Sequence, residues 1–244
     1  MVDEYIAERA TRGLRALGVA ESTDDGKSWS LVGLIALLDP PRPDSAETIV
    51  KANNLGVEVK MVTGDQLAIA IETCRRLNMG TNIMEGKELM YAKDGDSGLA
   101  SKVDKVDGFA GVYPEHKYKI VEALQSAGRL VGMTGDGVND APALKKANVG
   151  IAVADATDAA KGAADIILTE EGIGTIITAI VQSRMIFRRL ETYIIYRMAS
   201  SLTILMFFFF AVIILAFTFP TWTLVLLSLT NDLSAMATSF DRVR

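Results

Sequence analysis

The segment from Met133 to Pro142, which reads Met-Thr-Gly-Asp-Gly-Val-Asn-Asp-Ala-Pro, constrains the fold of this chain more than any other. An apolar run at 130–133 leads directly into two glycines and two aspartates, and the aspartates lie four residues apart. This pattern is typical of a buried strand, a tight turn and a helix, because glycine lets the backbone turn closely at a strand end. Carboxylate oxygens are also the ligands that Mg²⁺ prefers. We therefore predict a strand–turn–helix unit in which Asp136 and Asp140 bind Mg²⁺.

Other short apolar runs alternate with helical patterns between residues 57 and 168. The runs that we expect to form strands are 57–62, 108–113, 148–153 and 165–168. One helix is expected at 66–77 and another from Pro114, because proline is tolerated in the first turn of a helix. Strands that alternate with helices indicate an α/β fold with a parallel sheet, in which ligands bind at the carboxyl ends of the strands. Polar residues after these strands are therefore expected to share one crevice.

Two of these polar residues suit phosphoryl transfer in combination with the aspartates. Thr63 follows the first strand and can hold a phosphoryl oxygen through its hydroxyl, and Lys117 can do so through its ammonium group. Taken alone, Lys117 is typical of a solvated lysine at a helix start, and Thr63 of a hydroxyl that caps the next helix. Their order along the chain favours a shared phosphoryl site. The chain has no Asp-Lys-Thr-Gly stretch, however, to supply an attacking aspartate.

The composition changes sharply near the carboxyl end. Residues 202–219 carry no charge and include four consecutive phenylalanines, and about 18 apolar residues suffice to span a bilayer core. After a short turn at Pro220, residues 222–240 form a second candidate span. Arginines flank the open ends of both spans, which predicts that these ends lie in the cytoplasm. The alternative, a buried helical hairpin of a soluble protein, is disfavoured by the length of the uncharged run.

The second candidate span contains Asp232 near its middle, next to Asn231. An aspartate at the bilayer centre costs about 2.5–3.5 kcal/mol on insertion scales, so it normally faces a partner or a water-filled cavity. Asp232 is therefore a candidate proton carrier, and an aspartate that caps a broken helix is the alternative. Arg197 either serves as its counter-ion or extends to the membrane interface.

Four motifs, taken in order, resemble the successive motifs of the P-type cation-transporting ATPases. They are Asp39-Pro-Pro-Arg42, Met61-Val-Thr-Gly-Asp65, Val112-Tyr-Pro-Glu-His-Lys117 and Met133-Thr-Gly-Asp-Gly-Val-Asn-Asp-Ala-Pro142. The subfamily that they resemble most is the plasma-membrane proton pumps, and the likeness extends over nearly the whole chain. Several ordered motifs are far more specific than any one of them. The resemblance implies an α/β, haloacid dehalogenase-like phosphorylation domain with a parallel sheet, followed by a long helix into a two-helix transmembrane hairpin.

The resemblance also implies roles for individual residues. The catalytic residues would be Thr63, Lys117, Asp136 and Asn139, and the residues that contact the nucleotide or phosphoryl group would be Thr63, Gly64, Asp65 and Lys117. Asp136 and Asp140 would bind Mg²⁺, and ATP would be the substrate. The transport residues would be Asp232, Asn231 and Arg197, with Asp232 as the proton acceptor. Proton pumps carry an arginine within the fifth transmembrane helix where this chain has Thr203 or a neighbour, which leaves the transported ion open.

The resemblance further implies that the chain is a fragment, inactive alone, because such pumps carry an actuator domain and the phosphorylated aspartate ahead of these motifs. The expected parts are a tail of the nucleotide-binding domain at 1–38, the phosphorylation domain at 39–175, a stalk helix at 176–197 and transmembrane helices at 198–219 and 222–240. Its partners would be ATP, the proton, the lipid bilayer and the missing N-terminal part of the same pump. The α/β domain would lie in the cytoplasm, beneath the plasma membrane.

Three other functions stay open. The intact protein could pump a different cation. The chain could be a membrane-anchored phosphatase of the haloacid dehalogenase type, which would need a nucleophilic aspartate within the chain. It could also be a truncated product with a structural or regulatory role.

Composition adds few further bounds. A net charge of −5 and a pI near 5.1 argue against nucleic acid as a partner. The single cysteine, Cys74, fits a reducing compartment and is expected to be a buried small apolar residue. The single histidine, His116, is expected to have a structural role, and residues 91–105 to form a surface loop.

Overall fold

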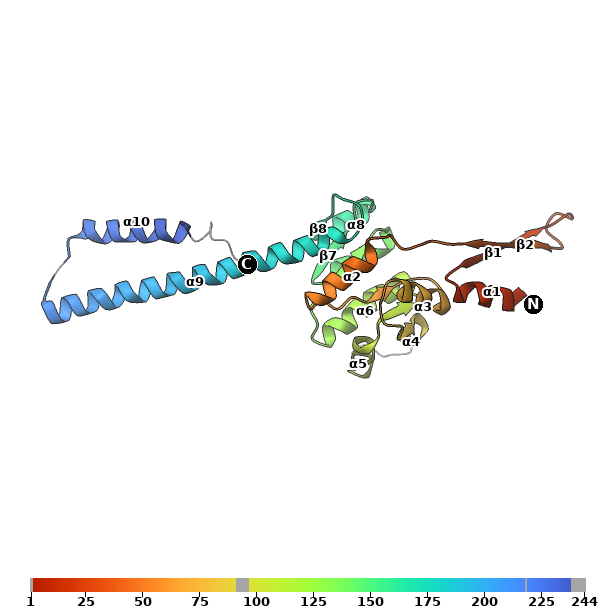
Figure 1. Cartoon of the computed structure of the whole chain (residues 1–244), viewed down its shortest axis with the longest axis horizontal. Helices are drawn as coiled ribbons and strands as arrows, with labels where there is room; N and C mark the ends of the chain where they lie inside the picture. Colours follow the sequence, from red (N-terminus) through yellow and green to blue (C-terminus); the bar gives the residue numbers. More distant parts are fainter. Residues whose placement is uncertain (1, 91–96, 218, 238–244) are drawn as a thin grey trace. The chain divides into compact units, whose positions relative to one another are not determined.

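The computed structural model describes residues 2–90, 97–217 and 219–237. The chain divides into two compact units, Met1–Ile177 and Thr178–Arg244. The first unit holds all of the described strands, and the second holds most of helix α9 and all of α10 (Figure 1).

The first unit begins with a helix and a two-stranded antiparallel hairpin. Helix α1 (Val2–Thr11) leads into β1 (Arg15–Glu21), which pairs with β2 (Ser30–Leu37). These elements make up most of the first 38 residues, which the sequence analysis assigned to the tail of a nucleotide-binding domain. Apolar side chains on both strands are exposed, among them Leu17, Leu31, Val32 and Ile35. Because a two-stranded hairpin is only marginally stable alone, these side chains are suited to pack against further structure.

The described part of the α/β body forms two three-stranded parallel sheets. The first has the order β3 (Met61–Val62), β5 (Gly108–Ala110) and β4 (Ile83–Glu85). The second has the order β6 (Gly132–Gly135), β7 (Val149–Ala152) and β8 (Ile166–Ile167). The predicted α/β class with parallel strands is confirmed, and the described strands form two parallel sheets where the sequence analysis expected one. Strands β3 and β6 each end a sheet, and no described strand pairs with both of them.

Helices connect and cover these strands. They are α2 (Ser45–Asn54), α3 (Leu67–Arg76), α4 (Gly86–Met90), α5 (Ser97–Lys105), α6 (Pro114–Ser126), the short 3₁₀ helix η1 (Val138–Asp140), α7 (Ala141–Lys146) and α8 (Asp158–Ala163). The helices predicted at 66–77 and from Pro114 are confirmed. The surface loop predicted at 91–105 is wrong for residues 97–105, because Val103 of α5 is fully buried in the core. Residues 91–96 lie outside the described part.

The main core lies between the first sheet and helices α4, α5 and α6. Its fully buried members include Phe109 on β5 and Leu89 on α4, and burying such a side chain contributes about 1.5–3 kcal/mol. A smaller cluster around Leu144 packs against β7 of the second sheet. Helix α6 joins the two halves, since the side-chain amide of Gln125 donates to the backbone carbonyl of Lys146 at 2.9 Å. Residues on α6 and residues after β6 are therefore held in one body.

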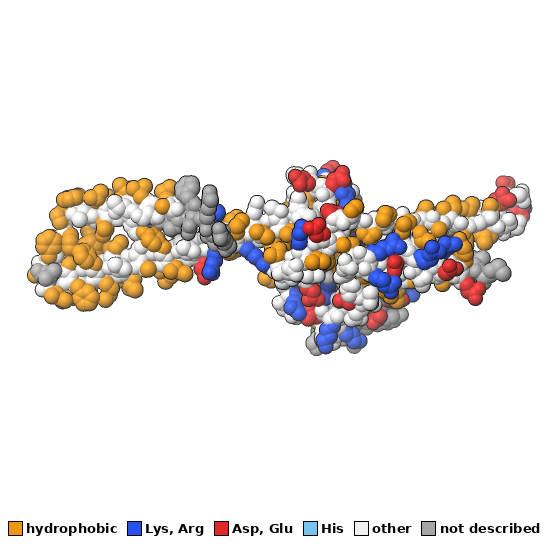
Figure 2. All heavy atoms as spheres, in the orientation of Figure 1, with side chains coloured by type: hydrophobic (Ala, Val, Ile, Leu, Met, Phe, Trp, Pro, Cys, Tyr) orange, Lys and Arg blue, Asp and Glu red, His pale blue; other side chains and the backbone are white. Residues whose placement is uncertain are grey.

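The second unit consists mainly of two helices. Helix α9 (Gly174–Leu215) confirms the expected long helix and includes residues 176–197 of the expected stalk, and by length and composition it could cross a membrane. Many large hydrophobic side chains are exposed on its carboxyl-side half and on α10 (Thr221–Ala237), where Figure 2 shows them along the edges of both helices. The predicted span at 198–219 ends as a helix at Leu215. The predicted span at 222–240 is helical to Ala237, and its last residues lie outside the described part.

Candidate active site

The turn after β6 is organised around the carboxylate of Asp140. Its Oδ1 atom accepts a hydrogen bond from Nζ of Lys117 at 2.5 Å, and its Oδ2 atom accepts from the backbone N–H groups of Asp136 and Gly137 at 3.3 Å each. Only 5% of the Asp140 side chain is exposed. A Cβ atom at Gly135 would lie 2.6 Å from that of Asp140, so this approach requires glycine. The predicted turn therefore forms around a buried carboxylate with three donors.

Asp140 is held in its charged form despite its burial. Burial alone would raise its pKa, but the hydrogen bond and charge of Lys117, with the two backbone N–H groups, outweigh this effect. The pKa of Asp140 therefore lies below its ordinary value. Because both of its carboxylate oxygens are bonded within the protein, Asp140 is suited to fix the conformation of the turn. Its role as a Mg²⁺ ligand stays a prediction.

Asp136 presents its side chain to solvent from the same turn, beside the exposed Asn139. The backbone carbonyl of Asp136 accepts a hydrogen bond from the N–H group of Thr157 at 2.8 Å, and Thr157 caps the start of α8. The described residues contain no cluster of three or more His, Cys, Asp or Glu side chains able to hold a metal. Mg²⁺ usually needs only one or two protein carboxylates, with substrate phosphates and water completing its shell. An exposed Asp136 on a fixed backbone fits that requirement.

Lys117 is positioned by the start of α6. Pro114 lies in the first turn, and the N–H group of Tyr113 donates to Nδ1 of His116 at 3.3 Å. His116 is buried with its ring edge-on to that of Tyr113, which supports the expected structural role. The side chain of Lys117 is 23% exposed and reaches Asp140 across 23 residues of sequence. The structure thus brings Lys117 to the Asp136–Asp140 turn, as the sequence predicted.

Thr63, Gly64 and Asp65 form a second group of polar residues, after β3. The hydroxyl of Thr63 accepts from the N–H group of Asp65 and donates to its Oδ2 atom, each at 3.1 Å. No hydrogen bond or ion pair in the described part of the chain joins this group to the Asp140 turn. The two groups instead follow β3 and β6, the end strands of the two sheets. The structure therefore brings Lys117 and the two aspartates together, whereas a crevice that they share with Thr63 stays a prediction.

Arg15 on β1 contacts one of the predicted site residues, a contact that the sequence did not reveal. Its guanidinium group forms an ion pair with the carboxylate of Asp65, and this hydrogen bond and charge raise the pKa of Arg15. The two residues lie 50 positions apart, and no motif includes Arg15. The only available signal was a charged residue that opens an apolar strand. The pair links the hairpin to the polar residues after β3.

The residues predicted for transport lie together in the second unit. The guanidinium group of Arg197 on α9 forms an ion pair with Asp232 on α10, and Tyr196 Oη donates to Oδ1 of Asn231 at 3.0 Å. This contact favours the counter-ion alternative for Arg197. Helix α10 continues through Asp232, so the alternative of an aspartate that caps a broken helix is not supported. Transport itself stays a prediction.

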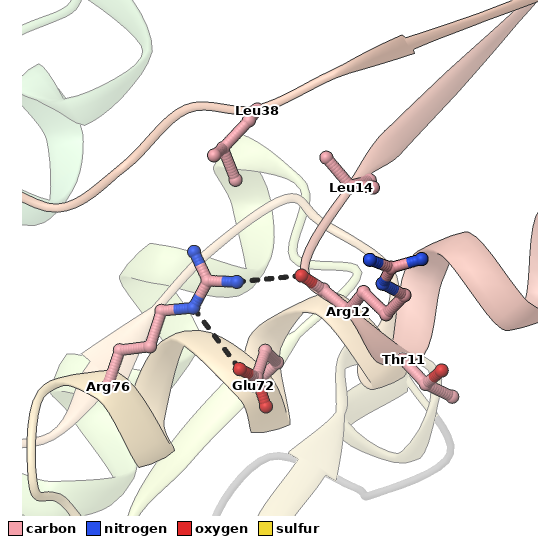
Figure 3. Close-up of a pocket in the computed structure, with 6 residues that line it drawn as sticks. All are labelled: Thr11, Arg12, Leu14, Leu38, Glu72 and Arg76. Atoms are coloured by element: carbon pink, nitrogen blue, oxygen red, sulfur yellow. Dashed lines mark hydrogen bonds and ion pairs between the residues drawn. The ribbon is translucent and has the colours of Figure 1, made fainter.

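A cavity of about 400 Å³ lies elsewhere in the first unit, where α1 and the hairpin meet α3 (Figure 3). The residues that line it are Thr11, Arg12, Leu14, Leu38, Glu72 and Arg76. Arg76 donates to the carboxylate of Glu72 at 3.2 Å and to the backbone carbonyl of Arg12 at 2.7 Å, the two interactions drawn in Figure 3. None of the predicted site residues lines this cavity. The two bonds of Arg76 therefore serve to attach the end of α1 to α3.

A parallel α/β body with polar residues gathered after its strands is the architecture of the haloacid dehalogenase-like hydrolases, and the chain belongs to that family. A family model with this description matches residues 3–148, and a second model with the same description matches residues 118–180.

Among solved structures, the chain is similar to a zinc-transporting PIB-type ATPase in its E2.Pi state. The two share 27% sequence identity with a TM-score of 0.68, over 97% of this chain and 32% of that chain. The chain therefore spans about a third of the length of that pump. The predicted haloacid dehalogenase-like class is confirmed, and so is the likeness to a P-type ATPase. The transported ion is not identified by this likeness.

Proposed function

We propose that this chain is the carboxyl-side part of an ATP-driven P-type pump that exports protons, in which ATP, water and an internal proton become ADP, phosphate and an external proton. The observation that carries the proposal is the buried Lys117–Asp140 pair beside the solvent-facing Asp136. Such a pump would lie in the plasma membrane, with the α/β body in the cytoplasm. The aspartate that is phosphorylated would belong to a preceding part of the pump.

The α/β residues would act on the phosphoryl group. Asp136 would hold Mg²⁺, which neutralises charge on the transferred group when bound. Lys117 would offer its ammonium group and Thr63 its hydroxyl to phosphoryl oxygens, while Gly64 and Asp65 would contact the nucleotide. Asp140 would keep the turn in place through its three hydrogen bonds, with Asn139 beside it. These are positioning and electrostatic tasks, which supply most of the catalysis in phosphoryl transfer.

Two open features of the first unit support a missing N-terminal part. Strands β3 and β6 each end a sheet, so each has an edge at which a further strand could pair. The polar residues follow these same two strands, so a strand added at either edge would bring its own carboxyl end to the site. The exposed apolar side chains of the β1–β2 hairpin would pack against the rest of a nucleotide-binding domain.

The choice of the proton rests on the second unit. Zn²⁺ is usually bound by cysteine, histidine and carboxylate ligands. Residues 178–244 contain no cysteine or histidine, and the aspartate on α10 is paired with an arginine. An aspartate beside a fixed cation suits reversible proton binding better than binding of a divalent metal. Zn²⁺ is nevertheless the second candidate, because the similar solved structure is a zinc-transporting ATPase.

Mg²⁺ binding to the 244-residue chain in lipid nanodiscs tests the α/β site. We expect calorimetric binding that weakens at least about tenfold in Asp136→Asn, since one carboxylate ligand is lost. Asp3→Asn, an exposed aspartate on α1, is the matched control and should bind as the parent does. Equal binding by Asp136→Asn and the parent chain would contradict the assignment of Asp136.

Transport is tested with the complete pump, reconstituted in sealed vesicles. We expect ATP to drive acidification or alkalinisation of the lumen according to orientation, and Asp232→Asn to abolish it. ATPase activity that depends on Zn²⁺, without proton movement, would favour the second candidate. Hydrolysis of a simple phosphate ester by the 244-residue chain alone would instead indicate a phosphatase whose nucleophile lies within it.

A further inference from the structure

Helices α9 and α10 contact each other through two pairs of polar residues at consecutive positions. Tyr196 and Arg197 are neighbours on α9, and their partners Asn231 and Asp232 are neighbours on α10. Both contacts join residues 35 positions apart. Tyr196 and Asn231 are half-buried, whereas both members of the ion pair are exposed. The hydrogen bond is thus the more protected of the two contacts.

Two contacts at consecutive positions restrict rotation of a helix in a way that one contact does not. Neighbouring residues on an α-helix project about 100° apart around its axis, since the helix has 3.6 residues per turn. A single ion pair between long, exposed side chains allows the helix to turn while the pair adjusts. A second contact about 100° away removes that freedom. Tyrosine suits this task because its rigid ring has few rotamers and carries a polar tip.

We propose that Tyr196 is a positioning residue, whose hydroxyl fixes the rotation of α10 through Asn231 and so holds Asp232 against Arg197. The geometry concerns α9 and α10 alone. The proposal rests on the proposed function only where it gives Tyr196 a role in transport. In a pump, the hydroxyl of Tyr196 would keep the proton-carrying carboxylate next to its counter-ion until the helices rearrange.

The test is the rate at which a hydrophobic carbodiimide modifies Asp232 in the 244-residue chain in lipid nanodiscs, followed by mass spectrometry. Such reagents attack protonated carboxyl groups within apolar surroundings, and a carboxylate paired with a guanidinium group reacts slowly. We expect Tyr196→Phe to raise the rate at Asp232 at least about threefold, because the ion pair forms less often when α10 can turn. Arg197→Met, which removes the pair, should raise it further.

Tyr193→Phe is the matched control, because Tyr193 lies about one turn earlier on α9 and its side-chain hydroxyl, unlike that of Tyr196, makes no hydrogen bond within the described part of the chain. It should leave the rate unchanged. Asn231→Ala should raise the rate as Tyr196→Phe does, and the double variant should react no faster than either single variant. Circular dichroism would reveal any loss of helix content in Tyr196→Phe. The comparison of the single variants with the double variant would still show whether the two residues act together.

An unchanged rate in Tyr196→Phe would overturn the proposal, whatever Arg197→Met does. Additive effects of Tyr196→Phe and Asn231→Ala would overturn it as well, since the two residues would then act separately. The labelling involves no transport. A failure of the complete pump to move protons would therefore disprove the proposed function and leave the positioning role of Tyr196 standing.

Discussion

Within the described residues, two pairs of a basic residue and an aspartate join different helices, and they lie in very different surroundings. In the α/β unit, the Lys117 and Asp140 side chains are 23% and 5% exposed, and two backbone N–H groups also bond to Asp140. In the helical unit, the Arg197 and Asp232 side chains are 44% and 52% exposed, and they bond to each other. The first pair is built into a folded body, whereas the second stabilises the protein only where lipid or a partner excludes water.

The largest expected effect follows from removing the cation of the buried pair. Lys117→Met should lower the free energy of unfolding of the α/β unit by about 3 kcal/mol, since it leaves a buried carboxylate without its counter-charge. Urea denaturation, followed by the accessibility of Cys74, measures the change. Lys102→Met on α5 is the control, and an exposed lysine of this kind should change the value by less than about 0.5 kcal/mol. Equal losses in the two variants would show that the Lys117–Asp140 pair adds no stability beyond that of an exposed lysine.

Cys74 should report whether the α/β unit is closed. Its side chain is fully buried, and burial, with the nearby charge of Asp107, raises the pKa of its thiol from 9.0 to about 11. At pH 8 the thiolate fraction is then about 100-fold lower than in the unfolded chain, so an alkylating reagent should react at least that much more slowly. The rate is measured with iodoacetamide with and without urea. Rapid labelling in native buffer would show that the unit opens.

Acid should weaken the α/β unit through Asp140. Its pKa in the folded state is lower than the ordinary value of 3.8, so its contribution to stability is fully present above that value. The contribution is lost as the pH falls below 3.8 and through the lower folded pKa. Urea denaturation at pH 6 and pH 3 should therefore show a smaller acid loss in Asp140→Asn than in the parent chain. An identical loss would mean that other carboxylates account for the acid sensitivity.

The smallest effect is expected for the exposed pair. Arg197→Met, in detergent micelles, should leave the denaturation midpoint of the helical unit within the scatter of repeated measurements, because half-exposed ion pairs contribute little in water. The same variant in lipid nanodiscs should show a measurable decrease, since Asp232 would then lack a partner in an apolar medium. Equal behaviour in micelles and bilayers would argue against a membrane setting for this pair.

The sequence predicted the site best where the chemistry is local. The Gly135–Asp140 turn follows from adjacent residues, and Pro114 marks the helix that carries Lys117. Pairings between distant segments could not be predicted in the same way. Arg15 meets Asp65 only through the path of the hairpin, and β4 has three residues, too few to show a periodic pattern. The separation into two sheets depends on which strands flank β3 and β6, which no local pattern encodes.

Helix α9 has 42 residues and contains no proline, and after its first residue no glycine. At 1.5 Å per residue it is about 63 Å long, and it lacks the proline that most often kinks a helix. Inserting one residue between Ile177 and Arg197 would advance everything beyond it by about 1.5 Å and turn it by about 100°. The direction in which Arg197 projects from α9 is thus set by residue count, and length variants of this helix would test its pairing with Asp232 without altering either side chain.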